Sequence, residues 1–118
     1  MLPLTRRDSG EAFEIHMDKF DIHDSKVFIA LKLDDVYAES YLSAAFNKLN
    51  EIEGEIEFLI ALRNIVEARG GISCIAEKAG VSRENLYKAL SKRGNPTLKT
   101  VRLVINALGL RFPNDIIS

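Results

Sequence analysis

The stretch Ile72–Leu90, ISCIAEKAGVSRENLYKAL, constrains the fold of this chain more than any other segment. Two short helical patterns meet at Gly80, and small or apolar side chains stand where two crossed helices would touch. A glycine can take the positive φ that ends the first helix, and Ser82 can cap the second by accepting a bond from a free backbone N–H. The spacing predicts a helix-turn-helix whose core consists of Ile75, Ala76, Ala79, Gly80, Val81, Leu86 and Ala89.

The second helix of such a pair can lie in the major groove of DNA. Residues near its start reach base edges, where arginine donates two bonds to guanine and glutamate accepts from cytosine or orients the arginine. The candidates for base readout are Ser82, Arg83, Glu84 and Tyr87. Two alternatives stay open: Glu84 as a carboxylate favoured by the helix dipole, and Tyr87 as an amphipathic cover over the helix pair. The candidates for phosphate contacts are Ser73, Lys88, Ser91, Lys92, Arg93 and Asn95, with the backbone N–H groups around Gly94 and Asn95.

Basic residues are concentrated around this motif, although the formal net charge of the 118-residue chain is only −1. Residues 1–54 hold 6 Lys and Arg against 11 Asp and Glu, a net charge of −5, whereas residues 55–118 hold 10 against 6, a net charge of +4. Between Lys78 and Arg111 the only acidic residue is Glu84. Phosphate binding depends on the local field, so this asymmetry favours a nucleic-acid partner. The alternative is a chance clustering of charge on a solvated helical face.

The composition fits one soluble globular domain. Hydrophobic residues make up 47% of the chain and charged residues 28%, and no apolar run approaches the ~20 residues that span a bilayer. The first residues lack the apolar core of a signal peptide. The single cysteine, Cys74, excludes an internal disulfide framework and suits a reducing compartment. We therefore expect a cytoplasmic protein that does not contact a membrane.

Helical periodicity predicts a mainly α fold, a compact helical bundle that contains the helix-turn-helix in a domain over residues 34–112. Asp34 and Asp35, then Ser82, then Thr97 are predicted to cap helices. The predicted helices are about Val36–Asn50, Glu55–Arg69, Ile72–Ala79, Arg83–Ser91 and Leu98–Leu108. In the last of these, the side chains predicted to face inward are Leu98, Val101, Val104, Ile105 and Leu108.

The two ends of the chain are predicted to be less regular. Residues 1–33 form an N-terminal arm that is partly flexible, and residues 113–118 form a tail. Within the arm, Val27–Leu33 alternates in the manner of a short β-strand, while a helical turn remains open for so short a run.

One recognition helix reads only a few base pairs, so a homodimer that spans one turn of DNA is expected. Three candidate dimer edges remain open. They are Val27–Leu33, Leu110–Ile117 and the aromatic face of the Val36–Asn50 helix.

The inventory of catalytic residues is thin. His16 and His23 lie in the arm without a cluster of metal-ligand spacing. Cys74 has no histidine partner placed by the sequence, and no glycine-rich phosphate loop occurs. We expect neither an enzyme nor a bound metal or cofactor.

The amino-acid sequence around the predicted helix-turn-helix resembles the HigA-like "probable addiction module antidote" family, a branch of the Cro/phage-repressor helix-turn-helix group. The resemblance covers about Asp34 to Phe112. It rests on Ile75-Ala76, Gly80-Val81-Ser82-Arg83-Glu84-Asn85-Leu86-Tyr87-Lys88-Ala89-Leu90, Gly94-Asn95-Pro96-Thr97 and Ala107-Leu108-Gly109-Leu110, with Tyr41-Leu42 to Phe46 upstream. The departures are the long N-terminus and Cys74, where the family often has Gln.

The resemblance implies an antitoxin of a type II toxin–antitoxin module. Such a protein would neutralise a RelE-like ribonuclease toxin and repress the operon that the two share. The acidic half of the chain would attract a basic toxin while the basic half holds double-stranded DNA. Alternatives are a solubilising role for the acidic half, a stand-alone prophage-type regulator without toxin, and an interaction module that uses the helix-turn-helix as scaffold.

Overall fold

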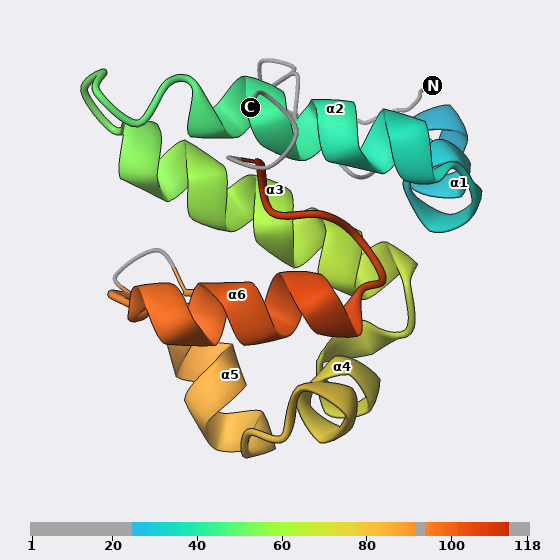
Figure 1. The fold of residues 1–118 in the computed structure, drawn as a ribbon, viewed down its shortest axis with the longest axis vertical. Coiled ribbons are helices and arrows are strands. Elements are labelled where there is room, and N and C mark those ends of the chain that lie inside the picture. The colour runs from blue at the N-terminus through green and yellow to red at the C-terminus, as the bar shows by residue number, and fades with distance from the viewer. Residues whose placement is uncertain (1–24, 92–93, 114–118) are drawn as a thin grey trace, which may run out of the picture.

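The computed structural model describes residues 25–91 and 94–113. The predictions made for residues 1–24, for Lys92 and Arg93, and for residues 114–118 lie outside these ranges. Within them the chain forms six helices, whose order is shown in Figure 1. They are α1 (Ser25–Leu33), α2 (Asp35–Phe46), α3 (Gly54–Ala68), α4 (Gly71–Ala79), α5 (Arg83–Ala89) and α6 (Leu98–Ala107).

The helix α3 is contacted by α1, α2 and α4, and α4 in turn contacts α5 and α6. Figure 1 shows α2 along one side of α3 and the α4–α5 pair at the opposite end of the molecule, with α6 between them. The largest fully buried side chains come from all six helices and include Leu31, Leu42, Leu62, Ile65, Ile75, Leu86 and Ile105. No helix in the described ranges is long and apolar enough to cross a membrane.

The helices predicted from residue 34 onward are confirmed to within a few residues at each end. Their starts follow the predicted caps. The Asp34 carboxylate accepts from the Tyr37 N–H at 3.0 Å, the Ser82 hydroxyl from Asn85 at 3.0 Å and the Thr97 hydroxyl from Thr100 at 3.1 Å. Each cap satisfies one backbone donor that the first turn leaves unpaired.

The prediction of a short strand at Val27–Leu33 is wrong, because this segment belongs to α1. Leu31 is fully buried, Val27 and Phe28 pack against the core, and the Asp34 N–H donates to the Ala30 carbonyl at 2.9 Å. Buried side chains three and four residues apart fit a helix, whereas the alternation that suggested a strand leaves Ile29 and Leu33 exposed. The spacing of apolar residues in this segment fits both a strand and a helical turn, and packing against the core determines that it is helical.

The inward-facing side of α6 is as predicted for Val101, Val104 and Ile105, which are buried. Leu108 is buried just after the helix. Leu98 is the exception, because 61% of it is exposed. The first turn of α6 therefore presents an apolar side chain to solvent.

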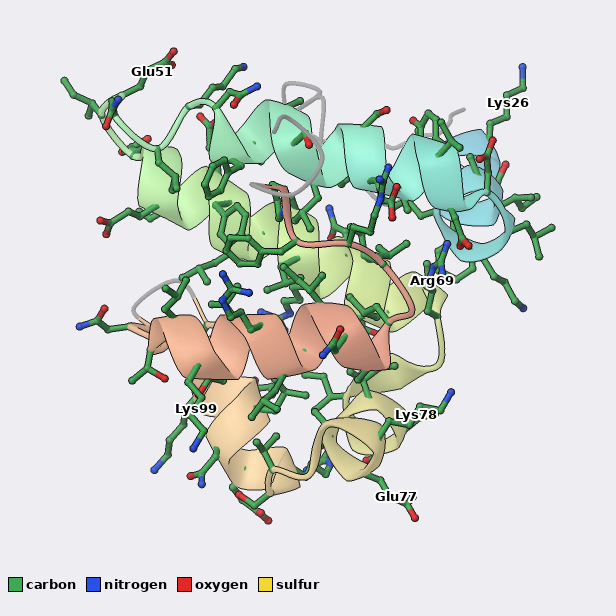
Figure 2. The ribbon with its side chains drawn as sticks, in the orientation of Figure 1. Lys26, Glu51, Arg69, Glu77, Lys78 and Lys99 are labelled. Carbon is green, nitrogen blue, oxygen red and sulfur yellow. The ribbon has the colours of Figure 1, made fainter. Side chains whose placement is uncertain are left out.

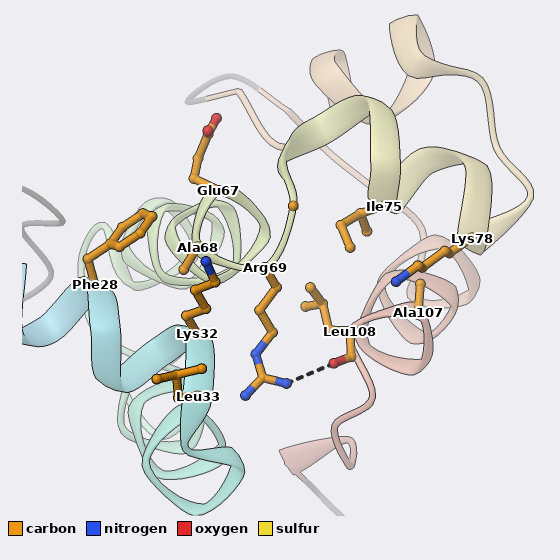
Figure 3. Close-up of a pocket in the computed structure, with 11 residues that line it drawn as sticks. Phe28, Lys32, Leu33, Glu67, Ala68, Arg69, Ile75, Lys78, Ala107 and Leu108 are labelled. Carbon is orange, nitrogen blue, oxygen red and sulfur yellow. Dashed lines mark hydrogen bonds between the residues drawn. The ribbon is translucent and has the colours of Figure 1, made fainter.

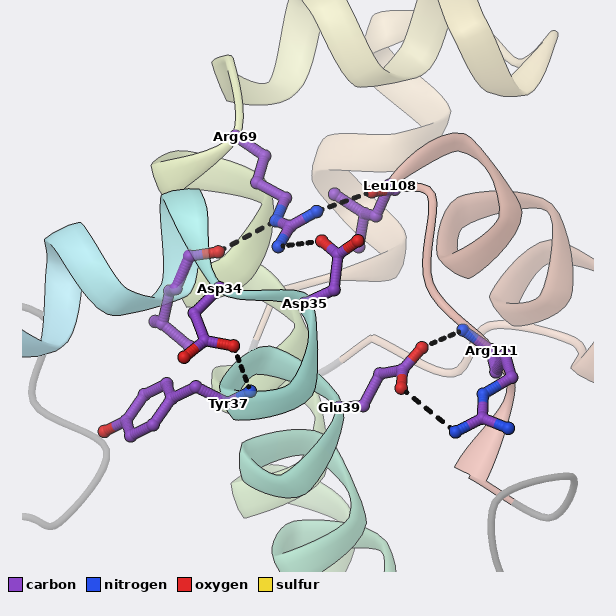
Figure 4. Close-up of polar contacts among 8 residues, drawn as sticks. Asp34, Asp35, Tyr37, Glu39, Arg69, Leu108 and Arg111 are labelled. Atoms are coloured by element: carbon purple, nitrogen blue, oxygen red, sulfur yellow. Dashed lines mark hydrogen bonds and ion pairs between the residues drawn. The ribbon is translucent and has the colours of Figure 1, made fainter.

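Arg69, which directly follows α3, joins three other parts of the chain (Figure 4). Its Nε donates to the Leu31 carbonyl at 2.8 Å, and a terminal nitrogen donates to the Leu108 carbonyl at 3.0 Å. The other terminal nitrogen lies 2.8 Å from Asp35, at the start of α2. A second link runs from Glu39 on α2 to the Arg111 backbone N–H, at 2.9 Å. These contacts hold the ends of α1, α2 and α6 around α3.

Candidate nucleic-acid interface

The α4–α5 pair is joined by Gly80, Val81 and Ser82. Gly80 has φ 76°, a left-handed conformation that favours glycine, and the Val81 N–H returns to the Ala76 carbonyl at 3.1 Å. Of the residues predicted to form the core of the pair, Ile75, Ala76, Ala79 and Leu86 are buried, Val81 and Ala89 are half-buried, and Gly80 is exposed. The turn thus lies at the surface while the crossing of the two helices is closed by small and apolar side chains.

The helix α5 exposes one face to solvent. Leu86 is its only fully buried residue. Exposed along the outer face are Ser82, Arg83, Glu84, Tyr87 and Lys88, and Ser73 and Asn95 are also exposed. All the residues predicted to read bases are therefore accessible from one side of this short helix.

Arg83 and Ser73 meet across the start of the two helices. The Arg83 Nε donates to the Ser73 hydroxyl at 2.9 Å. Arg83 stands in the first turn of α5 and Ser73 in the first turn of α4, ten residues earlier. The bond uses Nε and leaves the two terminal nitrogens of the guanidinium available. Ser73 can therefore orient Arg83 while these nitrogens remain free for a bidentate hydrogen bond.

Tyr87 is partly covered by a side chain that the sequence did not indicate. The guanidinium of Arg63, on α3, lies 5.7 Å from the centre of the Tyr87 ring, a cation–π distance. Tyr87 nevertheless remains 53% exposed. The tyrosine therefore both covers part of α3 and faces solvent. Arg63 was missed because it stands 24 residues earlier, on the helix that packs behind α5.

The segment after α5 is held close to the end of that helix. The Ser91 hydroxyl donates to the Lys88 carbonyl at 2.8 Å, and the Gly94 N–H donates to the Ser91 carbonyl at 2.8 Å. The prediction that the Gly94 N–H is free to hold a phosphate is therefore wrong, since this donor is used within the chain. Asn95 remains exposed beside it.

Gly94 stands against the backbone of α5. A Cβ at this position would overlap the Ala89 carbonyl oxygen and come within 2.7 Å of the Lys88 carbonyl oxygen. Backbone atoms cannot move aside as a flexible side chain can. Glycine therefore allows the segment to pass directly under the end of α5.

A cavity of about 630 Å³ opens on another side of the molecule, between α1, α4 and the end of α6 (Figure 3). Lys32 and Lys78 lie at its edges and Arg69 lies inside it. The Arg69 guanidinium is engaged by the contacts described above. This cavity is thus built around a structural arginine and does not include the outer face of α5.

Residues suited to metal binding do not gather in the part of the chain that the structure describes, where no group of three or more His, Cys, Asp or Glu could hold an ion. His16 and His23 lie outside that part. Cys74 is half-buried in α4 as a free thiol.

Comparison with known proteins links nearly the whole chain to one family. The model of the family described as "Probable addiction module antidote protein" matches residues 16–115. An uncharacterized protein of Haemophilus influenzae is 55% identical over 67 residues, which cover 54% of this chain and 68% of that protein. No solved structure gave a significant match. The chain belongs to the probable addiction module antidote family.

Proposed function

We propose that this chain is the antitoxin of a type II toxin–antitoxin module and that it also binds DNA as the transcriptional repressor of its own operon. Membership of an antidote family supports the first role, because an antidote implies a toxin partner. The observation that carries the second role is the exposed face of α5, where Arg83 is tethered to Ser73 beside exposed Tyr87 and Lys88. The protein acts in the cytoplasm as a homodimer, and the toxin is RelE-like.

In this proposal α4 and α5 are a helix-turn-helix, and α5 enters the major groove of the operator. Arg83 reads guanine through its terminal nitrogens, and Glu84 accepts from a neighbouring cytosine. Tyr87, supported by Arg63, contacts a sugar or a thymine methyl group. The phosphates are held by Ser73, Lys88, Ser91, Lys92, Arg93 and Asn95. Because the Ser91 hydroxyl donates to the Lys88 carbonyl of α5, it would contribute as an acceptor from a bridging water.

Loss of a base contact and loss of a phosphate contact are expected to affect binding to operator and random DNA differently. Arg83→Ala is expected to weaken operator binding by about 10- to 100-fold and to leave random-DNA binding within about threefold, since a bidentate base contact is worth about 1–3 kcal/mol. Lys88→Ala is expected to weaken both DNAs equally and to reduce the slope of log K against log salt by about one. Fluorescence anisotropy over a salt series, on the promoter of the gene and on a scrambled duplex, measures both.

Lys32→Ala is the matched control, because Lys32 is an exposed lysine on α1, away from α5. It should bind both DNAs as the unaltered protein does. Equal losses on the two DNAs for Arg83→Ala would refute base readout by this residue. Failure of the unaltered protein to shift its own promoter would refute the repressor role.

The toxin contact is assigned to the acidic half of the chain, and the structure narrows which of its charges are available. Asp35 pairs with Arg69, Glu39 pairs with Arg111, and the Asp34 carboxylate caps α2. Among the acidic side chains of residues 25–54, Glu51 and Glu53 remain exposed for a basic toxin, and the acidic side chains of residues 1–24 lie outside the described ranges. A truncation that removes residues 1–54 cannot test this, because it would remove the buried side chains of α1 and α2.

Charge-neutral substitutions in the full chain provide the test. The protein encoded beside this gene is co-expressed with it, and the chain is expected to restore growth and to co-purify with its neighbour. Replacing Asp18, Asp21 and Asp24 together by asparagine is expected to weaken the complex by about tenfold at low salt and less at high salt. Replacing Glu51 and Glu53 by glutamine tests the other acidic group in parallel. Unchanged affinity in both variants would mean that neither of these two acidic groups contacts the toxin.

A further inference from the structure

A cleft of about 220 Å³ opens where the end of α2, the start of α3 and the start of α6 meet. Its walls are largely apolar and include Phe46, Leu49, Phe58, Pro96, Leu98 and Phe112. Phe46 contacts Phe58 edge-on with ring centres 6.0 Å apart, and Phe112 likewise at 5.9 Å. Phe46 and Phe112 come from two of the segments predicted as dimer edges. The fold therefore brings those two segments together at one opening.

Two apolar side chains stand exposed beside this cleft. Leu98, on its rim, is 61% exposed. Ile52 is 93% exposed and lies in the connection between Leu49 and Glu55, both of which line the cleft. Leaving such side chains in water forgoes about 1.5–3 kcal/mol each relative to full burial. A cleft with protruding leucine and isoleucine side chains at its edge has the shape of a surface that both offers and receives an apolar group.

Charge is divided across the same surface. Glu51, Glu53 and Glu55 lie on the α2–α3 side and are exposed. Lys99 and Arg102 lie on the α6 side and are exposed; neither lines the cleft itself, but the Arg102 guanidinium sits 4.6 Å from the centre of the ring of Phe112, which does. In Figure 2 Glu51 lies at the upper left, on the connection between α2 and α3, and Lys99 lies on the same side of the view below the start of α6. An acidic side and a basic side that flank one apolar cleft are self-complementary under a two-fold rotation.

We propose that a second copy of this chain docks on this surface, with Leu98 of each copy in the cleft of the other and Arg102 against Glu55 of the partner subunit. The proposal names the interface of the homodimer in the proposed function. It also fits the position of α5, because the cleft includes Gly94 and Asn95, and Gly94 packs against the last carbonyls of α5. A two-fold dimer joined here carries one α5 helix on each side of its symmetry axis, the arrangement in which a dimer reads two half-sites.

The other exposed apolar group, which includes Ile29, Leu33 and Val36, lies on α1 and the start of α2. Figure 1 places this region at the end of the molecule away from α5. Pairing through it would hold the two α5 helices far apart.

Sedimentation equilibrium of the full chain without DNA tests the interface directly. The unaltered protein is expected to dimerise, and Leu98→Asp is expected to raise the dimer dissociation constant at least about tenfold, because a carboxylate cannot enter an apolar cleft unpaired. Arg102→Glu and Glu55→Arg should each weaken the dimer by about five- to tenfold. The double variant Arg102→Glu/Glu55→Arg should return to within about threefold of the unaltered protein, since the pair is restored with its signs exchanged.

Val36→Asp is the matched control and should leave the dissociation constant unchanged. A thermal melt of each variant separates loss of pairing from loss of fold. A monomer at about 100 µM, a dimer broken by Val36→Asp but not by Leu98→Asp, or a double variant that stays as weak as its parents would each overturn the proposal. Since no DNA is present, a dimer that behaves as expected but fails to shift its promoter would contradict the proposed function and leave this interface standing.

Discussion

Replacing Arg69 by methionine is expected to lower the free energy of unfolding by about 3–4 kcal/mol. Methionine keeps an apolar stem of similar length, so the change mainly removes the guanidinium. The side chain of Arg69 is only 13% exposed, and two of its bonds go to the carbonyls of Leu31 and Leu108. These carbonyls lie at helix ends, where the helix offers no donor of its own. Without the arginine, both acceptors would be left in a nearly dry site.

Urea denaturation measures this loss, and an unchanged slope would show that the native and unfolded states keep their compactness. Arg111→Met is the matched control. The Arg111 side chain is 64% exposed and its nitrogen lies 3.4 Å from Glu39, while the backbone bond to Glu39 is retained in the variant. Its loss should be below about 1 kcal/mol. Comparable losses for the two arginines would contradict the role given to Arg69.

The elements that local chemistry determines were predictable. Caps such as Asp34, Ser82 and Thr97 satisfy backbone donors only a few residues away, so their pattern can be read along the chain. The positive φ of Gly80 and of Gly109 follows similarly from glycine at a helix end. The exposed face of α5 followed from spacing as well, once Leu86 was assigned to the core.

What escaped prediction depends on contacts between distant residues. The helical state of α1 is decided by Leu31 packing into the core and by Arg69, 38 residues later, donating to its carbonyl. Arg63 over Tyr87 and Arg83 on Ser73 depend on how helices cross, which no periodicity encodes. The exposure of Leu98 could not be predicted for the same reason. The helical pattern places Leu98 on the inner face of α6, but it does not show whether another element covers the first turn of that helix.

The same distinction applies to charge. Counting charged residues along the sequence divides the chain into an acidic and a basic half. In the described ranges, however, three of the acidic side chains make contacts within the fold. Two of these carboxylates pair with arginines of the basic half: Asp35 pairs with Arg69, and Glu39 pairs with Arg111. Part of the opposition between the two halves is therefore an internal match that stabilises the fold. Only the remainder is available to a partner.

Gly94→Ala is expected to cost about 2–3 kcal/mol of stability and to weaken binding to every DNA by about tenfold. The added methyl would overlap the Ala89 carbonyl oxygen, and the Lys88 carbonyl oxygen lies within 2.7 Å of it. Neither can retreat without unwinding the end of α5, so the segment from Gly94 to Pro96 must move outward. That movement breaks the Gly94 bond to Ser91 and shifts Asn95, one of the proposed phosphate contacts, relative to the end of α5.

The loss of affinity should be the same on operator and random DNA, because Arg83 at the other end of α5 keeps its bond to Ser73. Asn95→Ala is the control for the segment itself. It removes one exposed side chain without touching the backbone, so its stability should change by less than about 0.5 kcal/mol and its DNA affinity by only a few-fold. Paired thermal melts and anisotropy titrations separate the two effects. If Gly94→Ala lost stability but bound DNA normally, the segment after α5 would be a structural support and the phosphate contacts would have to lie on α4 and α5 alone.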